Sequence, residues 1–410
     1  MANVLRAADL EPLLLGGCFF GSGGGGTVTS ARGLASHFAK GDYYPTDQVE
    51  VVSVDEARDG DAVMVAYMGS PEAIDGARYP LGPVLATQQV QARLASQGRQ
   101  LRYIVPPESG ALGFTVACLV AAKLGLKVVD ADGAGRAVPS LPMLTFASHE
   151  VDPRPAFLVS QGGLAVELDV TPRSGQHGDR QHQQDVSTIV EEMMRPIVAA
   201  PEFGEFGGLA MWVMGPDVLR AALPIRGTLS RALQTGRALI QGELRTPAAM
   251  IDYLARQHHV RAFTLFPAAE LLSAKVDTTG GFDLGTVCLK AGHEQANVLY
   301  QNESLLAWSN VHPAPLCMAP DSIAYFVEGA GQAVYSNGDL VQADGSLNPA
   351  LKGRKVTLLG LAADAALRVP KGLILDSFMA QAVTLGYHGP YVPVEKLPHV
   401  DADRVKGVQA

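Results

Sequence analysis

Cysteine, charge and long apolar runs are all scarce in this sequence. Its four cysteines are scattered, without a Cys-x-x-Cys spacing, which excludes a disulfide framework and favours a reducing compartment. The first residues lack the charged-then-apolar layout of a signal peptide, and no stretch is apolar over enough residues to span a bilayer. We therefore expect a soluble, cytoplasmic protein with no membrane partner.

The little charge that is present is mainly acidic. Charged residues make up 18% of the 410 positions, and the formal net charge is −9. Nucleic acids and anionic membranes attract basic surfaces, so this balance excludes nucleic acid as a partner. Hydrophobic residues reach 47%, and a chain of this length buries a large core in two or three domains. We expect an enzyme with a small-molecule substrate, and the sequence leaves a homo-oligomer open.

Glycine, in contrast, is concentrated near the start of the chain. Five of the six residues in 21–26 are glycines, and each costs roughly 0.5–1 kcal/mol against alanine in regular structure. Such a run indicates a backbone that approaches a ligand closely, with N–H groups turned toward it. We expect Gly23, Gly24, Gly25 and Gly26 to contact substrate, with a tight structural turn as the alternative.

The glycine run also satisfies the pattern G-x-G-x-x-G, which is typical of dinucleotide sites. That fingerprint requires a strand before it, whereas residues 7–16 have the pattern of a helix, and Asp55 comes late for the ribose-binding acid. A Walker A loop requires Lys-Ser/Thr after its last glycine, where Thr27-Val28 stands. A nucleotide-dependent enzyme is therefore only a second alternative.

Strands alternate with helices in the first part of the chain, which indicates βαβ units, a mainly parallel sheet and a three-layer α/β/α domain. The predicted strands are 49–54, 61–67, 101–105 and 127–130, and the predicted helices are 7–16, 29–40, 83–97 and 111–124. In such sheets ligands bind beyond the carboxyl ends of the strands. Glu108, Asp130, Asp132 and the segment 67–69 all follow strand ends, so we expect them to lie near the site.

The pattern changes after about residue 262 to short strands separated by turns, which predicts a C-terminal β-barrel or sandwich. The predicted strands are 271–276, 286–289, 297–302, 304–309, 322–327, 338–342 and 354–362. Before them we expect strands at 156–160 and 164–170, an apolar stretch at 207–214, and helices at 186–198, 216–240 and 247–258. The expected domains are 1–165, a mixed connecting region 166–260, the β-rich domain 261–375, and a closing helix and tail 376–410.

Two carboxylates and one guanidinium are grouped at Asp130, Asp132 and Arg136. Such a group can bind a hard cation, orient water as a base, or hold a carboxylate of the substrate. The alternative is a loop stabilised by Asx turns and an Asp–Arg pair.

Histidine and cysteine give no recognisable metal signature. The histidines considered are dispersed along the chain: His149, His177, His182, His258, His259, His293 and His312. Cys18 is flanked by apolar residues, as core cysteines are, although a nucleophile or a soft ligand is the other interpretation. A divalent metal, zinc first, would activate water, but the sequence names no ligands for it.

Several motifs together resemble one family in order and spacing. They are Gly21-Ser-Gly-Gly-Gly-Gly26, Glu108-Ser-Gly110, Val129-Asp-Ala-Asp-Gly-Ala-Gly-Arg-Ala-Val-Pro139, Gln301-Asn-Glu303 and Ala319-Pro-Asp-Ser-Ile323. With these motifs the chain resembles the S-methyl-thiohydantoin desulfurase-like family over roughly residues 10–371. Related domains occur with hydantoinase/oxoprolinase-type proteins. The chain differs from the family pattern at Thr27-Val28, where relatives often carry Asp-Pro, and after Glu108, where many carry a further Gly and an Asn.

The resemblance implies a three-layer α/β N-terminal domain and a C-terminal domain built on a β-barrel. For the characterised members it also implies hydrolysis of a cyclic S-methyl thioimidate to a hydantoin, with release of methanethiol. We therefore expect a hydrolase that attacks a C=N or C=O carbon of a small cyclic amide or thioimidate. A non-catalytic binding or regulatory subunit beside a hydantoinase-like partner is the first alternative.

The expected roles in that hydrolase follow from residue type. The glycine N–H groups would stabilise the developing negative charge, while Glu108, Asp130 or Asp132 would position water as the base. Arg136 would hold an acidic substituent of the substrate. Glu303, as a further catalytic carboxylate, and Asn302, as a binding residue, would reach in from the β-rich domain, because sites often form between domains.

Overall fold

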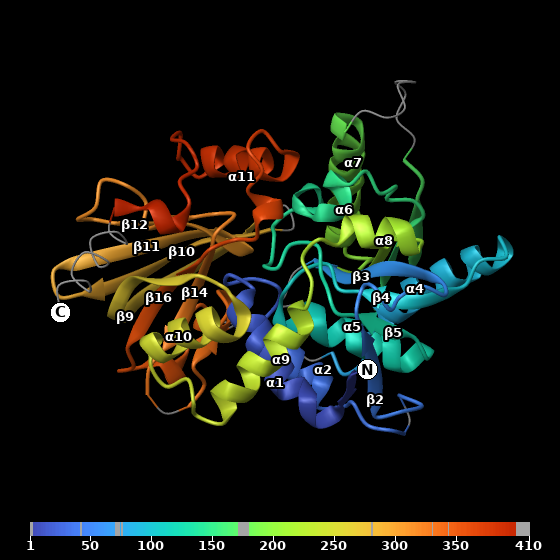
Figure 1. Cartoon of the computed structure of the whole chain (residues 1–410), viewed down its shortest axis with the longest axis horizontal. Helices are drawn as coiled ribbons and strands as arrows, with labels where there is room; N and C mark the ends of the chain where they lie inside the picture. The colour runs from blue at the N-terminus through green and yellow to red at the C-terminus, as the bar shows by residue number, and fades with distance from the viewer. Residues whose placement is uncertain are drawn as a thin grey trace.

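The computed structural model describes residues 3–41, 43–69, 74, 77–170, 180–279, 282–329, 331–342 and 344–398, without the side chains of 180–185 and 278–279. The predicted C-terminal tail beyond residue 398 lies outside this description. Two eight-stranded sheets, one in each half of the chain, lie side by side (Figure 1). No described helix combines the length and the apolar character needed to cross a bilayer.

The first sheet is mixed. Its strands, in spatial order, are β1 (Asn3–Arg6), β2 (Gln48–Val52), β5 (Lys127–Val129), β4 (Leu101–Val105), β3 (Asp61–Gly69), β8 (Phe206–Met214), β6 (Ala156–Ser160) and β7 (Ala165–Leu168). The four strands β2, β5, β4 and β3 run parallel, and every other pairing is antiparallel. The carboxyl ends of these parallel strands therefore share one edge, as expected for βαβ units.

Helices cover both faces of this sheet. Along β3, Val63 and Val65 face one apolar core and Ala62 and Met64 face the other, so both faces are buried, as in α/β proteins. The first core contains α1 (Ala7–Phe20), α2 (Val28–Ala35), α4 (Leu81–Ser96) and α5 (Ala111–Leu124). The second contains α6 (Thr145–Ser148), α7 (Arg180–Ala199) and α8 (Pro216–Ala222).

A close helix pair joins this half to the rest of the chain. Helix α9 (Thr228–Ile240) packs against α1, and α10 (Pro247–His258) then leads into the second sheet. A Cβ atom on Gly16 would lie 1.8 Å from the carbonyl oxygen of Ala232, and one on Gly236 would lie 1.7 Å from that of Pro12. The two helix backbones can approach this closely only because these positions carry no side chain.

The second sheet is antiparallel throughout. In spatial order it contains β13 (Cys317–Met318), β12 (Glu303–Ser309), β11 (Glu294–Gln301), β10 (Phe282–Ala291), β9 (Ala262–Thr279), β16 (Val356–Leu361), β14 (Ser322–Val327) and β15 (Val334–Tyr335). The end strands β13 and β15 are not paired with each other among the described residues. The predicted barrel is therefore supported as an eight-stranded antiparallel sheet and not as a closed barrel.

Several predicted elements coincide with the observed ones, and one is wrong. The predictions at 101–105, 111–124, 156–160, 247–258 and 322–327 match β4, α5, β6, α10 and β14. The strand predicted at 338–342 is instead a 3₁₀ helix, Gly338–Leu340, because the Asp339 side chain accepts hydrogen bonds from the backbone and hydroxyl of Ser336. The described part of the chain ends with α11 (Leu373–Thr384) and one 3₁₀ turn, Val394–Lys396.

Candidate functional site

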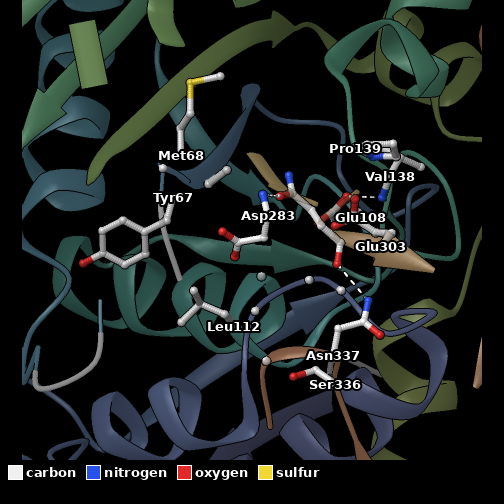
Figure 2. Close-up of a pocket in the computed structure, with 18 of the residues that line it drawn as sticks. Tyr67, Met68, Glu108, Leu112, Val138, Pro139, Asp283, Glu303, Ser336 and Asn337 are labelled. Carbon is white, nitrogen blue, oxygen red and sulfur yellow. Dashed lines mark hydrogen bonds between the residues drawn. The ribbon is translucent and has the colours of Figure 1, made fainter. Parts of the chain in front are cut away.

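A cavity of about 330 Å³ opens where the two halves of the chain meet (Figure 2). The N-terminal half contributes glycines 23–26 of the glycine loop, the end of β3 with Tyr67 and Met68, and Glu108 after β4. The C-terminal half contributes Asn302 and Glu303 at the junction of β11 and β12. The carboxyl edge of the parallel strands therefore forms part of the cavity wall, as the sequence predicts.

The glycine loop is packed tightly against both halves of the protein. A Cβ on Gly24 would lie 2.3 Å from Oε1 of Glu303, and one on Gly25 would lie 2.6 Å from Cα of Gly110. Gly25 also has a φ of 70°, in the left-handed region that favours glycine. The loop does approach other groups closely, but the nearest ones belong to the protein, and its contact with a substrate stays a prediction.

Glu108 faces the cavity from the loop after β4. Its Oε2 accepts a hydrogen bond of 2.7 Å from the backbone N–H of Val138 (Figure 2). Exclusion of water around the side chain raises the pKa of Glu108 well above its usual range, and the nearby charge of Glu303 raises it further. Glu108 therefore holds a proton more tightly than an exposed carboxyl does.

Glu303 lies beside Glu108 and is almost completely buried, with 4% of its surface exposed. Its Oε2 atom has no hydrogen-bond partner among the described residues. Burial raises the pKa of Glu303, while the positive charge of Arg136 and a backbone hydrogen bond from Gly25 oppose this shift. Two adjacent carboxyl groups in a desolvated site titrate as a pair and readily share one proton.

Asp132 follows β5 at the same edge of the sheet but does not line the cavity. Its fully buried carboxylate accepts hydrogen bonds from the Ser109 hydroxyl at 2.7 Å and from the backbone N–H groups of Ala134 and Gly135 at 2.9 and 2.5 Å. This is an Asx turn, the alternative that the sequence left open. The side chain holds its loop against the Glu108-Ser109-Gly110 motif.

Asp130 also lies away from the cavity wall. Its carboxylate accepts a hydrogen bond of 3.1 Å from the backbone N–H of Ser230, and a short one from the Ser230 hydroxyl, in the first turn of α9. A carboxylate in this place stabilises the start of a helix. Asp130 and Asp132 thus stabilise local structure and do not face the cavity.

Arg136 is buried between the two halves, with 1% of its surface exposed, and does not line the main cavity. It donates hydrogen bonds to the carbonyl oxygens of Ser304, Pro320 and Asp321 at 3.0, 3.1 and 2.9 Å. Burial lowers the pKa of Arg136 to about 10. Its guanidinium therefore joins the two halves of the protein, and its charge acts on the site through Glu303.

Other cavity residues were not identified from the sequence. Glu191 and Arg195 form an ion pair of 2.5 Å, four residues apart on α7, and Glu191 also accepts a hydrogen bond of 2.8 Å from the Ser140 hydroxyl. The i,i+4 spacing was the only local sign of this pair. Asp283 and Asn337 also line the cavity, and nothing in the sequence near them indicates such a position.

A carboxylate of the protein itself occupies the N-terminus of α2, directly after the glycine loop. Asp339 accepts hydrogen bonds from the backbone N–H groups of Val28 and Thr29 at 2.9 and 3.3 Å, and Thr27 caps the same helix. In nucleotide-binding loops this is the place where a phosphate binds. The geometry therefore weighs against the nucleotide-dependent alternative.

The described residues do not provide a metal centre. They contain no group of three or more His, Cys, Asp or Glu side chains that could hold an ion. His177 and the side chain of His182 lie outside the description. Among the residues that the structure describes, the donors around the cavity thus do not fit the zinc ion considered from the sequence.

Comparisons with known proteins agree with this architecture. A comparison with curated proteins finds no match. A crystal structure of a protein from Chromobacterium violaceum, solved in a structural genomics programme, is 56% identical in sequence and superposes with a TM-score of 0.88, covering 96% of this chain and all of that one. Residues 8–170 match the model of the S-Me-THD-like N-terminal domain, and residues 184–394 match that of the S-Me-THD-like C-terminal domain. The chain belongs to the S-Me-THD-like family.

Proposed function

We propose that this protein is a hydrolase of small cyclic amides or thioimidates, of the hydantoin or S-methyl-thiohydantoin type. One observation carries the proposal: Glu303 lines the cavity beside Glu108, and its buried Oε2 has no hydrogen-bond partner among the described residues. A buried polar atom without a partner is costly, and such atoms concentrate where a ligand completes them. The name of the family, which refers to S-methyl-thiohydantoin, supports the same substrate class.

The carboxyl pair supplies an acid and a base in one site. One carboxyl group, kept neutral by its raised pKa, donates its proton to the ring nitrogen of the C=N bond. The other, as a carboxylate, accepts a proton from the water that attacks the ring carbon. A C–O bond forms, and the π electrons of C=N become the new N–H bond.

The second half of the reaction releases the thiol. The new hydroxyl group loses its proton as C=O forms, the C–S bond breaks, and methanethiolate leaves with a proton from the carboxyl pair. The sum is thioimidate plus water giving hydantoin plus methanethiol. For a cyclic amide, the same pair would protonate the ring nitrogen that departs as the C–N bond breaks.

The glycine loop has a supporting role in this proposal. Gly24 leaves room for the Glu303 carboxyl, and Gly25 donates a backbone hydrogen bond to it. In this proposal the loop holds the reacting carboxyl in place. The sequence had instead suggested that the loop binds the substrate directly.

The test is turnover of a panel of hydantoins and S-methyl-thiohydantoins, followed by thiol release and by ring opening. We expect wild-type turnover, and a loss of about 10²–10⁴-fold in Glu303→Gln and Glu108→Gln, since general acid–base catalysis contributes about that much. Glu167→Gln, which changes an exposed ion pair with Arg93, is the control and should retain full activity. Tight binding of the panel without turnover would contradict the proposal and support a non-catalytic binding subunit.

A further inference from the structure

Asn302 has an unusual backbone conformation beside Glu303. Its φ is 56°, in the left-handed region, which few residues other than glycine adopt but which asparagine tolerates best. The residue lines the cavity. A strained residue that the surrounding structure holds in place is a reason to look for a function.

Three hydrogen bonds hold Asn302 in this conformation. Its N–H donates to the carbonyl oxygen of Asp283 at 2.8 Å, and its Oδ1 accepts the N–H of Asp283 at 2.8 Å. Its own carbonyl oxygen accepts a hydrogen bond of 3.0 Å from Nδ2 of Asn337 (Figure 2). Because only an oxygen can accept the N–H of Asp283, the orientation of the Asn302 amide is fixed.

The fixed amide leaves Nδ2 of Asn302 without a partner among the described residues. The same device occurs once more in the second sheet, where Asn310 and Gln295 exchange hydrogen bonds of 3.0 and 2.8 Å. There the asparagine Nδ2 donates to the carbonyl oxygen of His293 at 3.3 Å, and Asn310 lies outside the cavity wall. Of these two asparagines, only Asn302 thus has an Nδ2 that is left to donate to a ligand.

Two N–H groups of the glycine loop are engaged within the protein. The N–H of Gly24 donates to the carbonyl oxygen of Gly21 at 2.9 Å, and the N–H of Gly25 serves the Glu303 carboxyl. Of the four glycine N–H groups expected from the sequence to stabilise negative charge on the substrate, those of Gly24 and Gly25 are thus used within the protein.

We propose that Asn302 is a catalytic residue whose Nδ2 donates to an exocyclic ring oxygen, where negative charge develops. When water adds to a C=N bond whose nitrogen is joined to a carbonyl, the C–O bond forms and the displaced π electrons spread onto that carbonyl oxygen. The neutral carboxyl then donates its proton to the ring nitrogen, and the negative charge is neutralised. A donor fixed at this oxygen binds the transition state more strongly than the substrate. The substrate class is thereby restricted to rings with a carbonyl next to the reacting nitrogen. This inference rests on the proposed hydrolysis.

The variant Asn302→Asp separates the donor from the structural role. Aspartate tolerates the left-handed region and keeps an oxygen for the N–H of Asp283, but it removes Nδ2. We expect kcat to fall about 10²–10³-fold, as when an oxyanion donor is removed, with little change in KM and in thermal stability. Each variant is compared at its own pH optimum, since the added carboxylate shifts the pH profile. Asn310→Asp is the matched control and should keep full activity.

Two further measurements complete the test. A cyclic S-methyl thioimidate without the neighbouring carbonyl should turn over at least a hundredfold more slowly than S-methyl-thiohydantoin in the wild type. In Asn302→Asp this difference should shrink. Full activity of Asn302→Asp, or equal turnover of the two rings by the wild type, would overturn the inference and leave the hydrolase proposal standing.

Calorimetric binding of hydantoin gives a readout that does not depend on turnover. If the wild type binds hydantoin but turns over nothing, the proposed hydrolysis fails. The catalytic role of Asn302, which rests on that hydrolysis, then fails with it, whereas full activity of Asn302→Asp in an active enzyme overturns the role of Asn302 alone. If the wild type binds no member of the panel, both proposals fail.

Discussion

The carboxylate of Asp339 lies on the N-terminus of α2 and accepts the backbone N–H of Val28 at 2.9 Å. The two residues belong to opposite halves of the protein, and Asp339 also accepts hydrogen bonds from the backbone and hydroxyl of Ser336. A helix start that follows a glycine-rich loop normally attracts an anion of the ligand. Here the anion comes from the protein, and the interaction joins the halves.

Asp339→Ala should therefore destabilise the whole protein. Loss of a helix cap costs about 0.5–2 kcal/mol, and the buried N–H of Val28 is left without its partner, so we expect a loss of roughly 2–3 kcal/mol in the free energy of unfolding. Chemical denaturation measures it. Asp344→Ala is the control, because Asp344 accepts hydrogen bonds from Ser346 in an exposed turn. Equal effects of the two variants would contradict the prediction, as would strong stabilisation of the wild type by ATP.

Gly24→Ala tests the contact between the glycine loop and Glu303. The φ of Gly24 is not positive, so alanine is compatible with the backbone, but its Cβ would meet Oε1 of Glu303 at 2.3 Å. The carboxyl must move, so we expect kcat/KM to fall about tenfold or more, since misplacing a catalytic group by 1 Å costs up to about a hundredfold.

Gly41→Ala is the matched control for this variant. A Cβ on Gly41 meets nothing within 4 Å, and its φ is not positive either. It should leave the rate unchanged, and a normal rate in Gly24→Ala would show that Glu303 is not held by the loop.

The part of the site that the sequence predicts is the part built from strand ends and family motifs. Glu108 is expected at the cavity because it follows a strand of a parallel sheet, and ligands bind at that edge. Asp132 follows the same edge, but its position is decided by the hydroxyl of Ser109, 23 residues away. Which of two acids turns into a cavity depends on such partners, and no periodicity in the sequence specifies them.

The approach of Glu303 and Asn302 to the N-terminal half was expected from the sequence, but the contact of Asp339 with α2 was not. Asp339 lies about 310 residues beyond the helix that it caps. The strand predicted at 338–342 gave no indication of this capping role. The fold class was predictable because hydrophobic periodicity is local. In contrast, a sheet closes into a barrel only if its end strands pair with each other, and the pattern of short strands does not specify that pairing.

The raised pKa of Glu303 makes the stability of the protein depend on pH. In the folded state the carboxyl keeps its proton above the ordinary pKa of about 4.3, where the unfolded state has lost it. The unfolded state then binds fewer protons, so the free energy of unfolding falls as the pH rises, by up to about 1.4 kcal/mol per pH unit.

Glu303→Gln removes this dependence while keeping the shape of the side chain. We expect the variant to match the wild type near pH 4.5 and to be the more stable protein near pH 8. Urea denaturation at several pH values measures the difference. In Glu167→Gln, at an exposed ion pair, the free energy of unfolding should vary with pH as it does in the wild type. The same pH dependence in Glu303→Gln would contradict a buried, protonated carboxyl at Glu303.

Activity should show a bell-shaped dependence on pH, because the pair requires one proton and one charge. The pKa values of Glu108 and Glu303 are both raised, so both limbs of kcat/KM should lie above the ordinary carboxyl range of about 4.3. Glutamine in place of either residue should abolish one limb. A profile that is flat from pH 5 to 10 would remove the carboxyl pair from the mechanism.

Substitution of Arg136 distinguishes two roles of this residue, a structural clamp and a substrate-binding cation. Arg136→Met leaves the carbonyl oxygens of Pro320 and Asp321 without this donor, while that of Ser304 keeps a hydrogen bond of 3.3 Å from the Ser22 hydroxyl. Each unpartnered buried group costs about 1–3 kcal/mol, so we expect a loss of roughly 3 kcal/mol or more in the free energy of unfolding. Arg245→Ala, which removes an exposed side chain bonded to Gly242, should change little.

Arg136→Lys keeps the charge but loses the planar fork that reaches three carbonyl oxygens. We expect an intermediate stability with an unchanged pH profile, whereas Arg136→Met should shift the profile upward, because the charge of Arg136 holds down the pKa of Glu303. Substrates with and without an acidic substituent should be affected equally, since the guanidinium does not line the main cavity. A KM raised only for acidic substrates would restore Arg136 to the binding role that the sequence suggested.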